Sequence, residues 1–248
     1  EGMLADSLSN SAIWESLHGD LGASLAFSEE ANAIATRLGN PWGEAYSTGV
    51  RGLTLGLMGL FGRAVTDLRT GVEKAKTANF VGGQVIIGAF LSRILLEIGD
   101  IAGAVTVAQP AVVIGEERLP QFAGIALGRL AAAQIAQGDL DAAAETLANP
   151  LALVENQQYF VIYDICAAHI NLALARRQFD NAMTLADEAI GRLSLIGADV
   201  WLPDLRHLRA GALMGLGRFD EAAVDLDMAI DETRRMGIRG GLWQVLVT

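Results

Sequence analysis

The sequence lacks the features of a disulfide-stapled or membrane-embedded protein. Among 248 residues there is one cysteine, Cys166, so the chain cannot build an internal disulfide framework. Cys166 lies on an apolar helical stretch with no base in register, which favours a buried thiol over a nucleophile. No charge-free apolar run reaches the roughly 20 residues that a bilayer-spanning helix needs. No signal peptide is visible at the N-terminus. We therefore expect a cytoplasmic protein.

Basic residues are also scarce. The chain has 18 Lys and Arg against 29 Asp and Glu, which gives a formal net charge of −11. Nucleic-acid binding needs a phosphate-facing Lys/Arg surface, and anionic lipids repel an acidic protein. Only Arg206/Arg209 and Arg234/Arg235 could form a local basic stripe, and solvated helix surface is the simpler interpretation. The charge balance predicts neither a nucleic-acid partner nor a membrane partner.

Large rings are few, at 6% of residues, while apolar residues make up 52%. What the chain does have is a repeated turn. The six copies are Gly19-Asp20-Leu21, Gly59-Leu60-Phe61, Gly99-Asp100-Ile101, Gly138-Asp139-Leu140, Arg177-Gln178-Phe179 and Gly217-Arg218-Phe219. They are spaced 39 or 40 residues apart. A fixed period of this length predicts stacked helical pairs, an architecture that typically binds other molecules.

Small residues recur at two positions after each turn. The first position holds Ser24, Ala64, Ala104, Ala143, Ala182 and Ala222. The second, seven residues later, holds Ala31, Gly71, Ala111, Pro150, Ala189 and Ala229, where only Pro150 is not small. A methyl group or a hydrogen lets two crossing helices approach to about 8–10 Å, so these positions predict the crossing points of each hairpin. The large apolar residue of each turn is predicted to fill the gap between units.

Each unit is predicted to contain one helix before the turn and one after it. The units cover about 3–39, 41–79, 81–119, 121–157, 159–197 and 200–237, and residues 238–248 read as the start of a further helix. In the second unit we expect helices over 42–58 and 62–78. Because the chain starts at Glu1 and ends inside a predicted helix, we expect a fragment of a longer polypeptide.

Residues suited to helix ends support these boundaries. Aspartates that can cap second helices are Asp20, Asp100, Asp139, Asp180 and Asp220. Residues suited to closing them in a left-handed conformation are Gly39, Asn79, Gly197 and Gly237. Pro110 and Pro150 fall inside predicted second helices and should kink them. Five glycines between residues 49 and 62 predict a tightly packed helix.

The turn followed by two small residues resembles the tetratricopeptide repeat (TPR). The resemblance is most specific at Gly138-Asp139-Leu140-Asp141-Ala142-Ala143 and at Gly217-Arg218-Phe219-Asp220-Glu221-Ala222. The usual unit has 34 residues and a Trp-x-x-Leu-Gly signature that is absent or diffuse here. HEAT-type repeats share the longer period, but the Gly-Asp turn with its two alanines favours a TPR-like unit. The resemblance implies an all-α, right-handed solenoid of six TPR-like hairpins plus a truncated seventh.

Long units of this kind are similar to the helical repeat regions of large bacterial signalling proteins. Those proteins include ATPase-linked transcription activators related to the maltose regulator, and adenylate cyclases that carry an ATPase module. The resemblance implies a regulatory segment used in signal transduction.

No arrangement typical of catalysis stands out. The glycines at 52–62 lack a Gly-Lys-Ser/Thr ending and sit in a predicted helix, which argues against a nucleotide site. The histidines lie in three different units without metal-ligand spacing. An enzyme using Asp164, Asp204 and His207 is the weakest of our hypotheses, and we predict no catalytic residue, metal or cofactor.

Binding is better supported. In TPR-like arrays the first helices line the concave face. The polar or aromatic residues whose register points there are Tyr46, Arg93, Arg129, Asp164, Asn171, Asp204 and His207. Aromatic residues also recur where first helices begin, at Trp42, Phe80, Phe122, Tyr159/Phe160, Trp201 and Trp243. These rings either form a recognition strip or cover the preceding unit, and the second interpretation is simpler.

Our main hypothesis is a protein–protein interaction scaffold within a larger cytoplasmic bacterial signalling protein. The partner would be a peptide, another domain of the same chain, or a second copy in a homodimer. Packing of the polar groups against the next unit is the alternative to a binding role. The alternative function is a small-molecule sensor that holds a metabolite in the concave channel.

Overall fold

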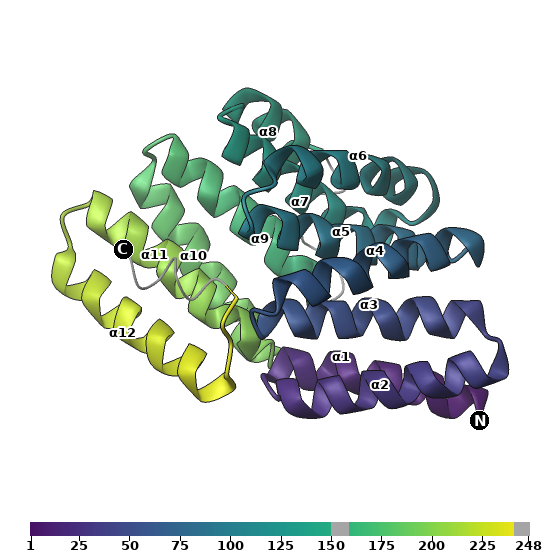
Figure 1. Cartoon of the computed structure of the whole chain (residues 1–248). Helices are drawn as coiled ribbons and strands as arrows, with labels where there is room; N and C mark the ends of the chain where they lie inside the picture. The colour runs from purple at the N-terminus through teal and green to yellow at the C-terminus, as the bar shows by residue number, and fades with distance from the viewer. Residues whose placement is uncertain (150–158, 241–248) are drawn as a thin grey trace.

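The computed structural model describes residues 1–149 and 159–240, and over these residues the chain consists of helices and turns without a strand (Figure 1). The helices are α1 (Gly2–His18), α2 (Leu21–Leu38), α3 (Pro41–Leu57), α4 (Phe61–Thr77), α5 (Val81–Glu97), α6 (Ile101–Arg118), α7 (Pro120–Gln137), α8 (Leu140–Leu147), α9 (Tyr159–Ala175), α10 (Phe179–Leu195), η3 (Asp199–Trp201), α11 (Leu202–Gly215) and α12 (Phe219–Met236).

Consecutive helices pair as hairpins, and the hairpins stack in chain order (Figure 1). The first helices of neighbouring units, α1, α3, α5, α7, α9 and α11, also contact one another along the stack. This confirms the predicted all-α repeat solenoid. In the second unit the helices begin and end within one residue of the predicted positions. No helix of the described residues combines the length and the apolar composition needed to cross a bilayer.

The repeated turns have the conformation that their residues favour. Gly138 has a φ of 83°, a left-handed value that costs glycine little, and Asp139 then accepts a hydrogen bond from the backbone N–H of Ala142 at 3.0 Å. Asp20 and Asp100 cap α2 and α6 in the same way. Asp180 and Asp220 are different, because each lies one residue after the start of α10 or α12 and is therefore in the first turn of the helix. There they face the positive end of the helix dipole.

The predicted helix closures are confirmed. Gly39, Asn79, Gly197 and Gly237 have φ values of 60°, 49°, 69° and 68°. Each follows the last residues of a second helix and lets the chain turn into the next unit. Arg177 takes a left-handed φ of 58° in the one turn that lacks glycine.

The small residues lie where helices cross. Ser24, Ala64, Ala104, Ala143 and Ala182 are 0% exposed and Ala222 is 2% exposed. The second small position is buried at Ala31, Gly71, Ala111, Ala189 and Ala229, whereas Pro150 lies outside the described residues. The tight packing of α3 is also confirmed. A Cβ atom added at Gly52 would lie 2.6 Å from Leu68 Cγ, closer than any real contact allows.

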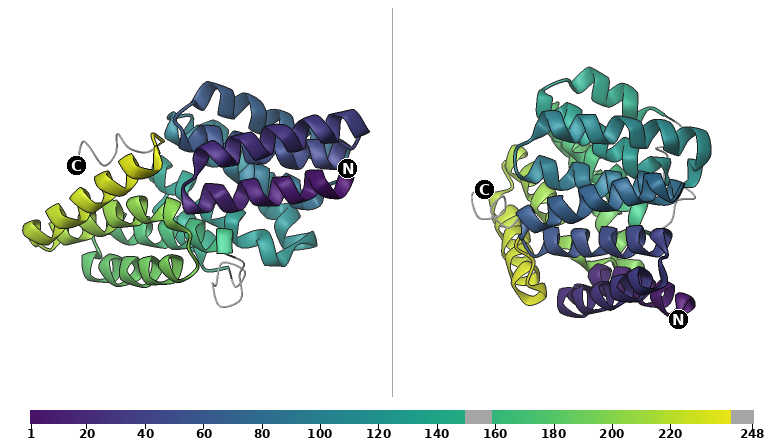
Figure 2. Two further views of the ribbon diagram at one scale, coloured as in Figure 1. Left: turned by 90° about the horizontal axis from the view of Figure 1, so that it is seen from below. Right: turned by 45° about the vertical axis from the view of Figure 1, so that its right-hand side comes forward.

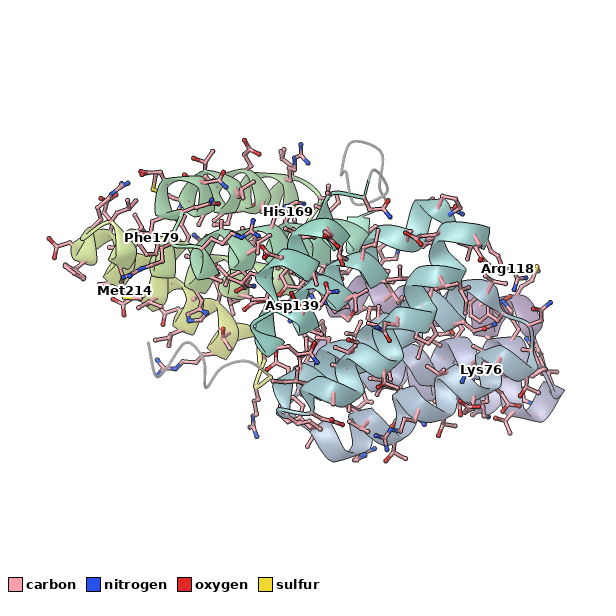
Figure 3. All side chains as sticks on the ribbon, turned by 90° about the horizontal axis from the view of Figure 1, so that it is seen from above. Lys76, Arg118, Asp139, His169, Phe179 and Met214 are labelled. Atoms are coloured by element: carbon pink, nitrogen blue, oxygen red, sulfur yellow. The ribbon has the colours of Figure 1, made fainter. Side chains whose placement is uncertain are left out.

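The large turn residues fill the gaps between units at five of the six turns. Leu21 is buried, and Phe61, Ile101, Leu140 and Phe179 are half-buried. Phe179 packs so closely on α11 that a Cβ atom at Gly215 would lie 2.4 Å from its ring. Figure 3 shows Phe179 and Met214 at the same end of the molecule. Phe219 contradicts the prediction, since it is 66% exposed. It belongs to the last unit, and no later described element packs over the start of α12.

Pro110 does not end its helix. α6 runs through it from Ile101 to Arg118, and Pro110 is exposed. The second predicted kink, at Pro150, lies outside the described residues.

The array curves until its two ends meet. The backbone N–H groups of Arg239 and Gly240 donate hydrogen bonds to the carbonyl of Leu57, at 2.8 and 3.0 Å. Met236 lies against Gly19, so α12 ends beside the first two units (Figures 1 and 2). Residues 238–240 are not helical, and the rest of the predicted further helix lies outside the described residues.

Replacing Ala182 with Leu should overpack the crossing of α9 and α10 and lower the free energy of unfolding by about 1–3 kcal/mol. Ala223→Leu is the matched control, because Ala223 lies exposed on α12. Urea unfolding followed by circular dichroism measures both. Equal stability of the two variants would contradict the assignment of Ala182 as a crossing point.

Candidate functional site

A cavity of about 350 Å³ lies between the first helices of units three to six, α5, α7, α9 and α11. Its apolar lining comes from small and aliphatic side chains such as Leu96, Ala132, Ile135 and Ala168. Its polar or titratable lining residues are Arg93, Glu97, Arg129, Tyr163, Asn171, Asp204 and His207. Side chains from four units therefore meet in one place.

The structure brings together most of the residues that the sequence singled out. Arg93, Arg129, Asn171, Asp204 and His207 line the cavity. Asp164 lies behind them, where it forms an ion pair with Arg129.

The Arg129–Asp164 ion pair is buried. Arg129 is 7% exposed and Asp164 is 5% exposed. Burial raises the pKa of Asp164 while the charges of Arg129 and Arg93 oppose this rise, and burial lowers the pKa of Arg129. Taking both charges out of water is costly, so the pair has to hold its geometry to remain favourable. It ties α7 to α9 at the base of the cavity.

One wall of the cavity is a stack of rings under a guanidinium group. Tyr163 and Trp201 stack with their centroids 4.5 Å apart and their planes 11° apart. The Cζ atom of Arg93 lies 4.2 Å from the Trp201 ring centroid and 4.9 Å from that of Tyr163. Arg129 approaches Tyr163 at 5.7 Å. Both cations thus contact the electron-rich ring faces, and Tyr163 Oη donates a hydrogen bond to Asp204.

Burial also shifts the pKa values of Glu97 and His207. Burial raises the pKa of Glu97, with Arg93 opposing the shift. Burial lowers the pKa of His207, against the opposing charge of Asp204. The cavity therefore favours neutral forms of both side chains.

The sequence analysis missed Glu97 and Tyr163 as cavity residues. A signal was present for each. Glu97 follows Arg93 by four residues and Tyr163 precedes Asn171 by eight, and both spacings keep side chains on one helix face. Trp201, expected to cover the preceding unit or to form an exposed strip, is 4% exposed and stacks on Tyr163 of that unit.

Tyr46 does not reach the cavity. Its hydroxyl donates a hydrogen bond to Asn10 Oδ1 at 2.8 Å, which links α3 to α1. Its ring contacts that of Trp42. The ring of Trp42 in turn contacts that of Phe80 in the next unit, with the two ring centroids 4.6 Å apart. Burial, followed by the charge of Asp6, raises the pKa of Tyr46 to about 12.

Phe122 packs against the core. The side chains of Tyr159 and Phe160, and all of Trp243, lie outside what the structure describes.

Searches for related proteins give a match in structure alone. No family model and no curated protein matches the chain. A Rap protein complexed with Competence and Sporulation Factor superposes with a TM-score of 0.75 at 16% identity, over 95% of this chain and 65% of that one. The apo form of RapI gives 0.69 at 14% identity, over 95% and 85%. A tetratricopeptide repeat protein from Parabacteroides merdae gives 0.50 at 14% identity, over 93% and 80%.

The chain is a TPR-like helical repeat domain. These low identities establish the fold alone. The chain spans 65% of the length of the Rap protein that it matches.

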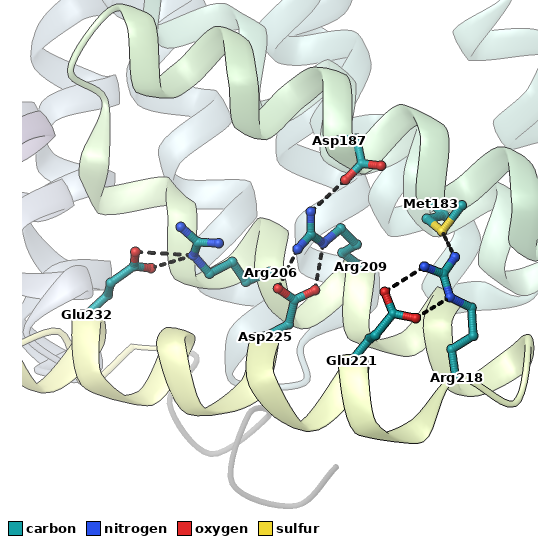
Figure 4. Close-up of polar contacts among 8 residues, drawn as sticks. All are labelled: Met183, Asp187, Arg206, Arg209, Arg218, Glu221, Asp225 and Glu232. Carbon is teal, nitrogen blue, oxygen red and sulfur yellow. Dashed lines mark hydrogen bonds and ion pairs between the residues drawn. The ribbon is translucent and has the colours of Figure 1, made fainter.

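Three arginines of the last unit of this TPR-like domain, Arg206, Arg209 and Arg218, form ion pairs with carboxylates (Figure 4). Arg206 Nε donates to both carboxylate oxygens of Glu232 at 3.1 Å. Arg209 pairs with Asp225 and Asp187, each at 2.6 Å. Arg234 and Arg235 lie in the last turn of α12, where positive charge meets the negative end of the helix dipole. Arg206 and Arg209, half of the stripe considered from the sequence, are therefore held in ion pairs that join α11 to α10 and α12.

Residues 1–149 and 159–240 contain no group of three or more His, Cys, Asp or Glu side chains able to hold a metal ion. Burial raises the pKa of the Cys166 thiol to about 11, so the reactive thiolate is rare near neutral pH.

Arg129→Met should lower the free energy of unfolding by about 3–5 kcal/mol, because it leaves the carboxylate of Asp164 buried without a partner. The double variant Arg129→Met/Asp164→Leu should regain much of that loss, since it removes both charges. Chemical denaturation of the parent, the single and the double variant tests this. If the double variant is no more stable than the single one, the pair is not the cause.

Tyr46 should titrate near pH 12 in the folded protein, whereas an unfolded tyrosine titrates near 10. Because the folded pKa is the higher one, the stability linked to this group is present below pH 10 and lost as pH rises toward 12. Phenolate absorbance during a pH titration, with Tyr46→Phe subtracted, isolates this component. A difference curve centred near pH 10 would show that Tyr46 is not buried as described.

Proposed function

We propose that this TPR-like domain is a regulatory interaction scaffold, and that its partner inserts a peptide segment into the cavity between α5, α7, α9 and α11. The observation that carries the proposal is the convergence of polar side chains from four successive units on one cavity. A fold held together by small apolar crossings does not require charged groups there, and their burial is costly. A binding role accounts for that cost.

Two further points support a partner of protein nature. A cavity that spans four units can contact an extended segment at several places along its length, as repeat arrays do. The superposed Rap protein was solved in complex with Competence and Sporulation Factor. We further propose that the domain acts as a regulatory segment of a larger cytoplasmic signalling protein.

A small-molecule sensor is the second candidate, and the size of the cavity favours it. About 350 Å³ lies within the range of about 300–1,000 Å³ that is typical of sites for small ligands. In this hypothesis a metabolite bridges the first helices and alters the curvature of the array. The experiment on this cavity separates the two candidates.

A cavity-blocking variant tests the scaffold hypothesis. Ala136 lines the cavity and is exposed, so Ala136→Trp should fill it without disturbing the core. Ala223→Trp on α12 is the matched control. Peptides selected on the parent protein from a random display library should bind Ala136→Trp about tenfold or more weakly, and Ala223→Trp unchanged, by isothermal titration calorimetry. The scaffold hypothesis fails if no peptide is selected, or if the selected peptides bind both variants like the parent.

A further inference from the structure

Three buried N–H groups beside the cavity have no hydrogen-bond partner among the described residues. They are Arg93 Nη1, Arg129 Nε and Trp201 Nε1. Every one of them is a donor. Burying a donor without an acceptor costs free energy, so native proteins rarely leave one unmatched. Three in one place indicate that an acceptor belongs there.

The three donors belong to one cluster around the ring of Tyr163. Arg93 and Arg129 lie 4.9 and 5.7 Å from its centroid, and Trp201 stacks on it. Arg129 and Trp201 are more than nine-tenths buried, and both arginines line the cavity. Stacking fixes the plane of the Arg93 guanidinium, which leaves its edge to bind a ligand.

Both aspartates beside the cavity are already engaged. Asp164 is paired with Arg129, and Asp204 accepts a hydrogen bond from the hydroxyl group of Tyr163. Burial also favours the neutral form of Glu97. At these three N–H groups the protein supplies donors without acceptors, and a ligand can supply the missing acceptor.

The residues around the three donors favour a carboxylate over a phosphate. Two planar guanidinium groups match the two oxygens of a carboxylate. The carboxylate of Asp204 lies in the same lining and would repel a doubly charged phosphate more strongly than a singly charged carboxylate. Aliphatic side chains such as Ile135 and Leu208 suit an apolar body behind the charged group.

We infer that this cavity is a carboxylate-binding site, in which Arg93 and Arg129 hold the carboxylate of a ligand whose apolar body packs on α7 and α11. The inference rests on the proposed function, because it names the group by which the ligand of the same cavity is recognised. The carboxylate is supplied either by a peptide, as its C-terminus or an acidic side chain, or by a free aliphatic acid.

The first test needs no variant. Hexanoate and its neutral analogue hexanamide are titrated into the full chain labelled with ¹⁵N. Hexanoate should shift the Nε–H resonances of Arg129 and Trp201, which report on the unmatched donors directly. Hexanamide should bind about tenfold or more weakly. Equal binding of acid and amide, or the absence of shifts at these two N–H groups, would overturn the inference.

The second test uses Arg93, which has no ion pair within 4 Å among the described residues, so that its replacement leaves no carboxylate there without a partner. Arg93→Gln should weaken hexanoate binding about tenfold or more and leave hexanamide binding unchanged, whereas Arg93→Lys should restore part of it. Arg63→Gln, on the exposed face of α4, is the matched control. If Arg93→Gln binds hexanoate like the parent, the assignment of Arg93 is wrong.

The peptides selected on the parent protein identify the source of the carboxylate. Binding that is lost when the peptide's acid groups are converted to amides assigns it to a peptide. Peptides that bind regardless of this conversion would overturn the inference and leave the scaffold hypothesis standing. Binding of hexanoate without any selectable peptide would support the carboxylate site and contradict the protein partner.

Discussion

The close approach of helices at small residues is the constraint on which the rest of the structure depends. Ser24, Ala64, Ala104, Ala143, Ala182 and Ala222 are almost fully buried, one to a unit, where only a methyl group or a short hydroxyl fits. Since the two helices of each unit cross at the same position of the repeat, each unit stacks on the preceding one with a similar rotation. The first helices are then held side by side, and one face of each looks into a common space. A larger residue at any crossing would disturb both the hairpin and the alignment of the first helices with their neighbours.

Because of this alignment, residues that lie one repeat apart in the sequence come together at one site. Arg93, Arg129, Tyr163 and Asp204 lie roughly one repeat apart in the chain, yet they line one cavity on four helices. None of them is needed to close a hairpin. Apolar side chains in place of the buried Arg129–Asp164 pair would cost less free energy to bury. The two arginines share the ring of Tyr163 and keep donors unmatched within the described structure. Polarity that the fold does not require, concentrated at one level of the stack, is the strongest physical argument for a binding role.

Much of the fold could be predicted because its determinants are local. The glycine turns, the Asp20, Asp100 and Asp139 caps and the small crossings each act within a few residues. The site was harder to predict than the fold. The helical register in the sequence shows which face of a helix points inward, but it does not show which turn of that helix lies level with the cavity. Tyr46 was predicted to point toward the concave face with the arginines, yet its hydroxyl bonds to Asn10 of the first unit. Glu97 and Tyr163 were missed although their spacing places them on the right faces. Phe219 was misjudged because a gap-filling residue needs a following unit, which the described chain does not supply.

The cavity and the meeting of the two chain ends both depend on the same curvature. Arg239 and Gly240 bond to Leu57 at the end of α3, and Met236 packs on Gly19, so the last unit rests on the first two. The cavity is bounded by units three to six, which form the arc between those contacts. A change in the rotation between neighbouring units would alter the separation of Arg93 from Asp204 and would also pull Leu57 away from Arg239. Because closely packed crossings resist gradual deformation, the terminal contacts hold the arc at the curvature that keeps both arginines against the ring of Tyr163.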